Sequence, residues 1–283
     1  MTLLNTLWNE FIYGGHWGSL AASAIALSLS LLIDINITLP FLIIVYLGTQ
    51  CIYSYNHHKE LDKDEKSNLP RTNHLSKYIH NHSITTSIYA VLYIGLLVYF
   101  GDKLSIFFGG SLLLIGLFFT YRAKSFSMKI TGFKTYYVAF SWALLPFFTA
   151  VFYSYPIDLT ICLFSLFVFI RFFIDASFFD LKDVDVDKSQ NLSTLILSFR
   201  TKKNFLNLLH VINILSSIPI LLAIFLDIIP FYSILLLITL LYSLVYIQKG
   251  KNENADILSL SYILVDGEYY YWPFFLMIGL YLF

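Results

Sequence analysis

The feature that most constrains this chain is a series of nine apolar runs, each about long enough to cross a lipid bilayer as a helix. A spanning helix needs about 20 mostly apolar residues, and 58% of the 283 residues are hydrophobic. Only 13% are charged, against about 25% in a typical soluble domain. We therefore expect an all-α, multi-span bundle of about nine helices that forms one domain over residues 1–283. The runs cover residues 18–34, 37–55, 84–100, 103–121, 135–153, 157–179, 204–226, 229–247 and 257–282.

The charged residues are concentrated in four long loops, which cover residues 56–83, 122–134, 180–203 and 248–256. These loops hold 16 of the 18 Lys and Arg residues. With nine spans all four loops lie on one side of the membrane, and an excess of Lys and Arg marks the cytoplasmic side. We therefore expect a multi-pass protein of the cell membrane. The net charge of zero gives no general attraction for nucleic acid, so we expect none as a partner.

A first acidic cluster follows the second apolar run without a break, at residues 56–65. If the helix continues through it, Asn56, Glu60 and Asp64 recur at spacings of four residues and share one face. A second cluster covers residues 180–187 and follows the sixth run in the same way.

In the second cluster, Asp180, Asp183 and Asp187 recur at spacings of three and four residues, so they also share one helical face. Asp185 points away from that face, and we expect it to lie in solvent. The alternative for both clusters is a pair of solvated helix ends with alternating charges.

Two acidic faces across a pocket indicate bound magnesium. Crowded carboxylates raise one another's pKa, and a divalent cation removes that penalty. Magnesium prefers oxygen ligands, and typically binds one or two carboxylates together with phosphate oxygens and waters. Magnesium on a diphosphate would neutralise the leaving group while an allylic carbon–oxygen bond breaks. We therefore expect Mg²⁺ as cofactor.

The clusters resemble the two motifs of the UbiA superfamily of intramembrane prenyltransferases. The first family motif is N-D-x-x-D-x-x-x-D, in which Asn56 matches the Asn, and Glu60 and Asp64 match the second and third acids. The sequence from Asn68 to Arg71 resembles the basic turn that follows. The second motif, D-x-x-D-x-x-x-D, is matched at every acidic position by residues 180, 183 and 187.

The sequence departs from the family pattern at three places. His57 stands where the first Asp is expected, and neutral histidine is a poor magnesium ligand. Either the first cluster binds one ion less tightly, or Asp62 compensates. Glu60 also replaces an Asp. A family Tyr-x-x-x-Lys element is only approximate here, because Tyr121 and Lys124 are one residue too close.

The resemblance implies a helical bundle whose central cavity opens sideways to the lipid. The prenyl tail would lie among apolar and aromatic side chains, and the diphosphate would lie under a cytoplasmic cap of long loops. Asp180 and Asp183 are the expected catalytic residues. Cations make strong hydrogen bonds to phosphate oxygens, so the expected diphosphate-binding residues are Arg71, Lys124 and Lys182.

Four charges inside the apolar runs are candidates for the cavity. Arg171 lies in the sixth run, and Asp175, four residues on, is its expected ion-pair partner. Asp266 and Glu268 lie near the middle of the last run, where they indicate either an acceptor site or a kinked helix. The five histidines between residues 57 and 82 fit no zinc spacing, and we expect them in solvent.

The leading hypothesis is transfer of a polyprenyl group from an isoprenyl diphosphate to a lipophilic or aromatic acceptor. Family members use quinone precursors, glyceryl-phosphate lipids, porphyrins or carotenoid chains, and the acceptor here stays open. Three alternatives remain: a terpene cyclase, an inactive relative that binds prenyl lipids, and a membrane transporter. A transporter should hold its coupling ion near the bilayer midplane in broken helices, whereas the main acids here follow the spans.

Overall fold

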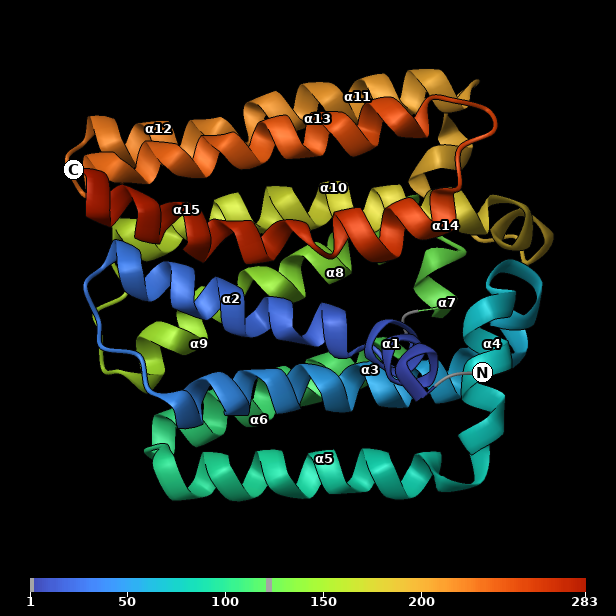
Figure 1. The fold of residues 1–283 in the computed structure, drawn as a ribbon, viewed down its shortest axis with the longest axis horizontal. Coiled ribbons are helices and arrows are strands. Elements are labelled where there is room, and N and C mark those ends of the chain that lie inside the picture. Colours follow the sequence, from blue (N-terminus) through green and yellow to red (C-terminus); the bar gives the residue numbers. More distant parts are fainter. Residues whose placement is uncertain (1–2, 121–123) are drawn as a thin grey trace.

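The computed structural model of the protein describes residues 3–120 and 124–283, without the side chains of residues 62–67, 124 and 125. Every regular element among the described residues is a helix and none is a strand, which confirms the expected fold class. Long helices run side by side, and short helices gather at one end, where α1, α4, α7 and α14 lie (Figure 1). We call this end the cap.

The elements follow one another along the chain with few long connections. They are α1 (Leu3–Tyr13), α2 (His16–Leu32), α3 (Leu39–Ser67), α4 (Leu69–Leu75), η1 (Ser76–Tyr78), α5 (Ile79–Phe100), α6 (Lys103–Phe118), α7 (Lys124–Ser127), α8 (Phe133–Ala143), α9 (Leu145–Phe152), α10 (Leu159–Ser189), η3 (Leu195–Ser198), α11 (Lys202–Leu215), α12 (Ser217–Phe225), η4 (Phe231–Leu237), α13 (Ile238–Gly250), α14 (Ile257–Ser259), η5 (Leu260–Val265) and α15 (Glu268–Leu282).

Each of the nine apolar runs falls on one helix or on consecutive helices. By length and composition, five helical segments in the described chain could cross a membrane, and a sixth if α1 and α2, bent by 58°, count as one. The exact number of spans therefore stays a prediction. The expectation that residues 56–83 form a loop was wrong, because α3 and α4 continue through them.

Several helices end in the same way, which explains the short turns between them. Asp34, Ser154, Asn191 and Asp227 follow helices and have φ values of 53–55°. In each case the next residue donates its N–H to a carbonyl five residues back, as in Ile35 to Ser30. This left-handed cap satisfies carbonyls that a helix end leaves without partners.

Apolar side chains cover much of the outer surface. On α5, the exposed fractions of Ile84, Val91 and Tyr99 are 61%, 69% and 81%. A soluble protein rarely exposes a continuous apolar surface of this kind, whereas lipid contact favours it. The arrangement fits a bundle whose outer helices face lipid.

Helix α10 runs through the middle of the bundle (Figure 1). It contacts α8, α9, α11 and α12, and its side chains are buried over most of its 31 residues. Asp158 caps its first turn by accepting a hydrogen bond from the backbone N–H of Ile161. The second acidic cluster therefore lies on a helix that is held along its whole length.

Replacing Gly279 with alanine is expected to destabilise the protein by about 1–3 kcal/mol, as overpacking does. A Cβ there would lie 2.9 Å from the Cβ and 3.0 Å from the backbone oxygen of Tyr232 in η4. Thermal unfolding in detergent, followed by circular dichroism, measures the change. Gly110→Ala is the matched control, because its Cβ meets no atom within 4 Å. Equal midpoints for the two variants would contradict this close packing.

Candidate active site

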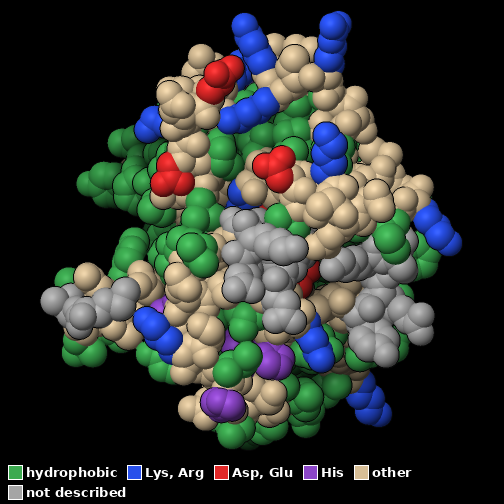
Figure 2. Space-filling view, turned by 90° about the vertical axis from the view of Figure 1, so that its right-hand side faces the viewer, with side chains coloured by type: hydrophobic (Ala, Val, Ile, Leu, Met, Phe, Trp, Pro, Cys, Tyr) green, Lys and Arg blue, Asp and Glu red, His purple; other side chains and the backbone are tan. Residues whose placement is uncertain are grey.

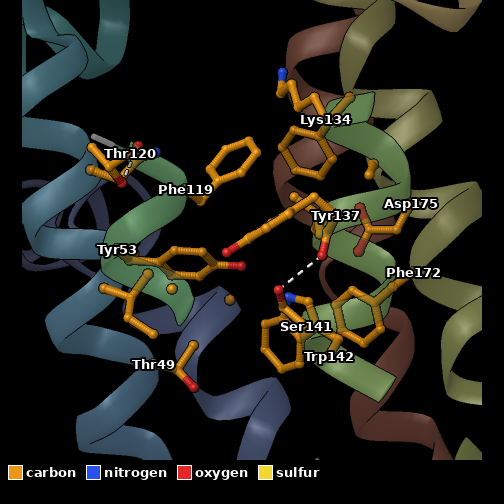
Figure 3. A pocket seen from close by; sticks show the side chains of 18 of the residues that line it. Thr49, Tyr53, Phe119, Thr120, Lys134, Tyr137, Ser141, Trp142, Phe172 and Asp175 are labelled. Atoms are coloured by element: carbon orange, nitrogen blue, oxygen red, sulfur yellow. Dashed lines mark hydrogen bonds between the residues drawn. The ribbon is translucent and has the colours of Figure 1, made fainter. Parts of the chain in front are cut away.

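A cavity of about 330 Å³ lies inside the bundle, between α2, α3, α6, α8 and α10. Its cap end carries charged and polar side chains from α3, α4, α8 and α10. Its inner end is apolar and includes Val45, Leu145 and Phe148. Figure 3 shows α3 and α6 on one side and α8 and α10 on the other. The cavity thus joins a polar cap region to an apolar interior.

The first acidic cluster reaches this cavity through Asn56 and Glu60, which line it from α3. The Asn56 amide donates a hydrogen bond to Glu60 (3.3 Å) and its oxygen accepts one from Thr120, which follows α6 (3.1 Å). The helix continues to Ser67 as expected. The side chains of Asp62 and Asp64 lie outside the described residues, so their expected roles stay predictions.

The second acidic cluster meets the first across the cavity. Asp183 lines the cavity, and Asp180, Asp183 and Asp187 are all buried, with exposed fractions of 1%, 6% and 0%. Asp185 is exposed, as expected from its position on the other side of the helix. The three carboxylates therefore share one face of α10 and point into the protein instead of toward solvent, which argues against two solvated helix ends.

Among the described side chains, three cations line the cap end of the cavity. Arg71 and Lys182 were expected there, and the Lys182 ammonium lies 2.8 Å from a carboxylate oxygen of Asp183. The third is Lys134 of α8, whose ammonium lies 2.9 Å from Asp180 Oδ1. The side chain of Lys124 lies outside the described residues. More Lys and Arg side chains stand around the rim of this end of the molecule (Figure 2).

Lys134 is a site residue that the sequence analysis missed. It lies at the end of a charged loop and at the start of the fifth apolar run, where it belongs to no acidic motif. Its neighbour Thr135 donates a hydrogen bond to the other oxygen of Asp180 (3.2 Å). The sequence signal that could have found it is its position one residue before the fifth apolar run, which places its side chain where the cap meets the membrane.

His57, which occupies the position of the family's first Asp, does not face solvent as expected. Its exposed fraction is 7%, and its ring stacks on Tyr53 with centroids 5.9 Å apart. Burial, and then the charge of Arg71, lower the pKa of His57 well below its usual range, so the ring is neutral. His74 is also buried and contacts Glu10 at 2.7 Å. The expectation of solvated histidines holds for His80 but was wrong for these two.

The donor atoms at the cap end are oxygens, which suit magnesium. Among the described side chains, no three His, Cys, Asp or Glu residues come together closely enough to hold a metal alone. Magnesium typically takes only one or two carboxylates and completes its shell with phosphate oxygens and waters. Asn56, Glu60 and Asp183 around one cavity therefore fit an ion that is bound jointly with a phosphate-bearing substrate.

Below the charged end, aromatic rings form the cavity wall. Trp142 and Phe172 stack with centroids 4.1 Å apart and an interplanar angle of 10°. Tyr137 reaches from α8 to α6, where its hydroxyl donates to the Ile115 carbonyl (2.7 Å), and its ring stacks on Phe119. Such faces attract cations, so the wall suits a carbon chain on which positive charge develops.

Arg171 and Glu268 do not line the cavity, which corrects their expected cavity role. The Arg171 guanidinium donates from Nε to Glu268 Oε1 (2.8 Å) and from Nη2 to Oε2 (2.6 Å). Asp175 was expected as the partner, and this was wrong. A planar guanidinium binds a carboxylate best through two parallel hydrogen bonds, which Glu268 of α15 supplies.

Asp175 and Asp266 do line the cavity, as expected. Asp175 Oδ2 accepts a hydrogen bond from the Tyr269 hydroxyl (2.8 Å). Asp266 lies where the last run breaks, between the π-helix η5 and α15. Both acids therefore lie at the cavity as the sequence predicted, Asp175 on the continuous helix α10 and Asp266 at the break.

The model of the UbiA prenyltransferase family matches residues 17–265. The chain belongs to this family. No curated protein matches the sequence. Among solved structures, a UbiA homologue from Aeropyrum pernix K1 is 12% identical, with a TM-score of 0.68 over 94% of this chain and 96% of that one. The membership makes this chain an integral membrane protein.

Two further structures share the UbiA fold. A homologue from Archaeoglobus fulgidus, bound to GPP and Mg²⁺, is 13% identical, with a TM-score of 0.66 over 95% of this chain and 99% of that one. A digeranylgeranylglyceryl phosphate synthase is 13% identical, with a TM-score of 0.62 over 97% and 98% of the two chains. At this identity the likeness is one of fold, and this UbiA protein's substrates follow from its own residues.

Proposed function

We propose that this UbiA protein transfers a prenyl group from an isoprenyl diphosphate to an acceptor in a Mg²⁺-dependent reaction. The observation that carries the proposal is the cavity itself. Residues of both acidic clusters and three of the described cations line its cap end, while its interior is apolar and aromatic. A prenyl diphosphate has the same division, with a charged head and an apolar tail. The relative that binds GPP and Mg²⁺ supports this choice.

In this proposal Asn56, Glu60 and the carboxylates at 180, 183 and 187 would hold Mg²⁺, and Asp64 joins them by its motif position. Bound Mg²⁺ would neutralise charge on the diphosphate as it leaves. Arg71, Lys134 and Lys182 bind diphosphate oxygens through charge-assisted hydrogen bonds. The aromatic wall orients the prenyl chain and excludes water from its reactive carbon. Asp180 and Asp183 are the proposed catalytic residues.

We also propose that the cap faces the cytoplasm of the cell and that residues 1–283 work as one domain. The Lys and Arg residues of the four charged segments support this orientation. The cavity would open sideways to the lipid, so that lipid-soluble substrates reach it from the membrane. Single cysteines introduced at the exposed Arg200 and at Phe283 should be labelled by a membrane-impermeant thiol reagent from opposite faces of sealed vesicles.

Purified protein in detergent is expected to consume geranyl diphosphate only when Mg²⁺ is present. Removing the metal with EDTA should reduce diphosphate release at least about 100-fold, because the leaving group then carries its full charge. Restoring Mg²⁺ should restore the rate. Labelled geranyl diphosphate with an acceptor mixture, analysed by chromatography, measures both the rate and the products.

The products separate the remaining alternatives. A prenylated acceptor supports transfer, and a cyclic hydrocarbon formed without acceptor identifies a cyclase. Binding of the prenyl diphosphate without release of diphosphate identifies an inactive lipid binder. The structural reason to test for this outcome is His57, which stands in place of an acid. Ion flux in sealed vesicles with no diphosphate consumed would overturn the proposal in favour of a transporter.

A further inference from the structure

The cavity contains a second polar region, separate from the diphosphate end. On α10, Asp175 and Asp183 both line the cavity, eight residues apart. At a rise of 1.5 Å per residue they lie about 12 Å apart along the helix. This distance leaves room for a metal-bound diphosphate and the first prenyl carbon between them. A group beside Asp175 would therefore lie next to the reacting carbon.

The carboxylate of Asp175 is directed into this region. Its exposed fraction is 6%, and Figure 3 shows it pointing from α10 toward the centre of the cavity, while Tyr53 reaches in from the opposite wall. Oδ2 accepts the hydrogen bond from Tyr269, but Oδ1 accepts none from any described residue. This oxygen is open to the cavity, so a ligand that donates a hydrogen bond could reach it.

Acidic side chains predominate in this region. Asp266 also lines the cavity, and within the described residues no Lys, Arg or His forms an ion pair with Asp175 or Asp266. Arg171 lies behind the wall, but Glu268 binds it bidentately. The three lining cations all lie on the cap side, where Lys134 and Lys182 contact Asp180 and Asp183.

We infer that Asp175 and Asp266 bind the acceptor and select a neutral molecule with a hydrogen-bond-donating hydroxyl group. Such a hydroxyl donates to Asp175, and the stacked rings of Trp142 and Phe172 hold the body of the molecule. An acceptor that carries a carboxylate or a phosphate is rejected, because its buried negative charge would find no described cation paired with these acids to offset the loss of water. This inference rests on the proposed prenyl transfer and names the class of its second substrate.

Matched pairs of probes that differ in charge test the inference by isothermal titration calorimetry at pH 7.5. The pairs are 4-hydroxybenzamide with 4-hydroxybenzoate, and 1-O-dodecylglycerol with its phosphate. At least one neutral probe is expected to bind about tenfold or more tightly than its anionic partner. Equal or tighter binding of both anions, or no binding of either neutral probe below about 1 mM, would overturn the inference.

Isosteric variants show whether the two acids are responsible. Asp175→Asn and Asp266→Asn, alone and together, should bring the affinity ratio of each pair toward one, and each single variant gives a result if the double variant does not fold. Asp185→Asn, an exposed acid on the same helix, should keep the wild-type ratio. Preserved discrimination in both single variants would contradict the assignment.

The two proposals fail on different measurements. Prenyl transfer fails if wild-type protein releases no diphosphate from geranyl diphosphate with Mg²⁺. The acceptor assignment fails if the neutral probes do not bind more tightly than their anionic partners, and this binding measurement requires no turnover.

Discussion

Replacing Asp183 by alanine is expected to reduce prenyl-diphosphate consumption by about 100- to 1,000-fold while the protein stays folded. Asp183 lines the cavity from α10 and holds Lys182 at 2.8 Å. Its loss would remove a proposed Mg²⁺ ligand and release a cation from its position, and losing one preorganised electrostatic contact has an effect of this size. Turnover of labelled geranyl diphosphate in detergent measures it.

Asp185→Ala is the matched control for this prediction. It removes the same side chain from the same turn of α10, but Asp185 is exposed. Its turnover should equal that of the wild type. If Asp183→Ala retains wild-type turnover, the second acidic cluster does not activate the diphosphate, and the proposed catalytic role is lost.

Replacing Arg171 by methionine is expected to destabilise the protein by about 3–5 kcal/mol, because it leaves the Glu268 carboxylate buried without its cation. The two residues have exposed fractions of 1% and 2%. Arg171 also donates to Asn213 and Ser243, so it joins α10 to α11, α13 and α15. The thermal midpoint in detergent should fall by about 10 °C.

A double variant separates the contribution of the ion pair to stability from that of packing. In the double variant Arg171→Met/Glu268→Leu no buried charge is left alone, so it should regain a large part of the lost midpoint. Arg200→Met, which removes an exposed cation, should change the midpoint little. A double variant as unstable as the sum of both single variants would show that the two side chains do not stabilise each other.

The sequence predicted the helices and the meeting of the acidic clusters because both depend on local spacing. Apolar runs of spanning length have one stable form in lipid, and residues three and four apart must share a helical face. Asp180, Asp183 and Asp187 are therefore buried together on α10, and Asp185 is not. The break at Asp266 followed from charges within an apolar run.

Contacts between distant segments could not be predicted in this way. Glu268 lies 97 residues after Arg171, and nothing in the local pattern favours it over Asp175 four residues away. Lys134 reaches Asp180 across 46 residues. His57 and His74 have polar neighbours in sequence, yet both are buried, and His74 contacts Glu10 of α1. Side-chain partners of this kind depend on how helices pack, which a single sequence does not record.

Helix α10 fixes the spacing of Arg171, Asp175 and Asp183, because all three lie on one unbroken helix of 31 residues. One inserted or deleted residue between Asp175 and Asp183 would turn everything beyond it by about 100° and aim the motif away from the cavity. Relatives can therefore alter the acceptor end by exchanging side chains, but not by changing the length of this segment. Variation in chain length should instead accumulate in the connections at the cap.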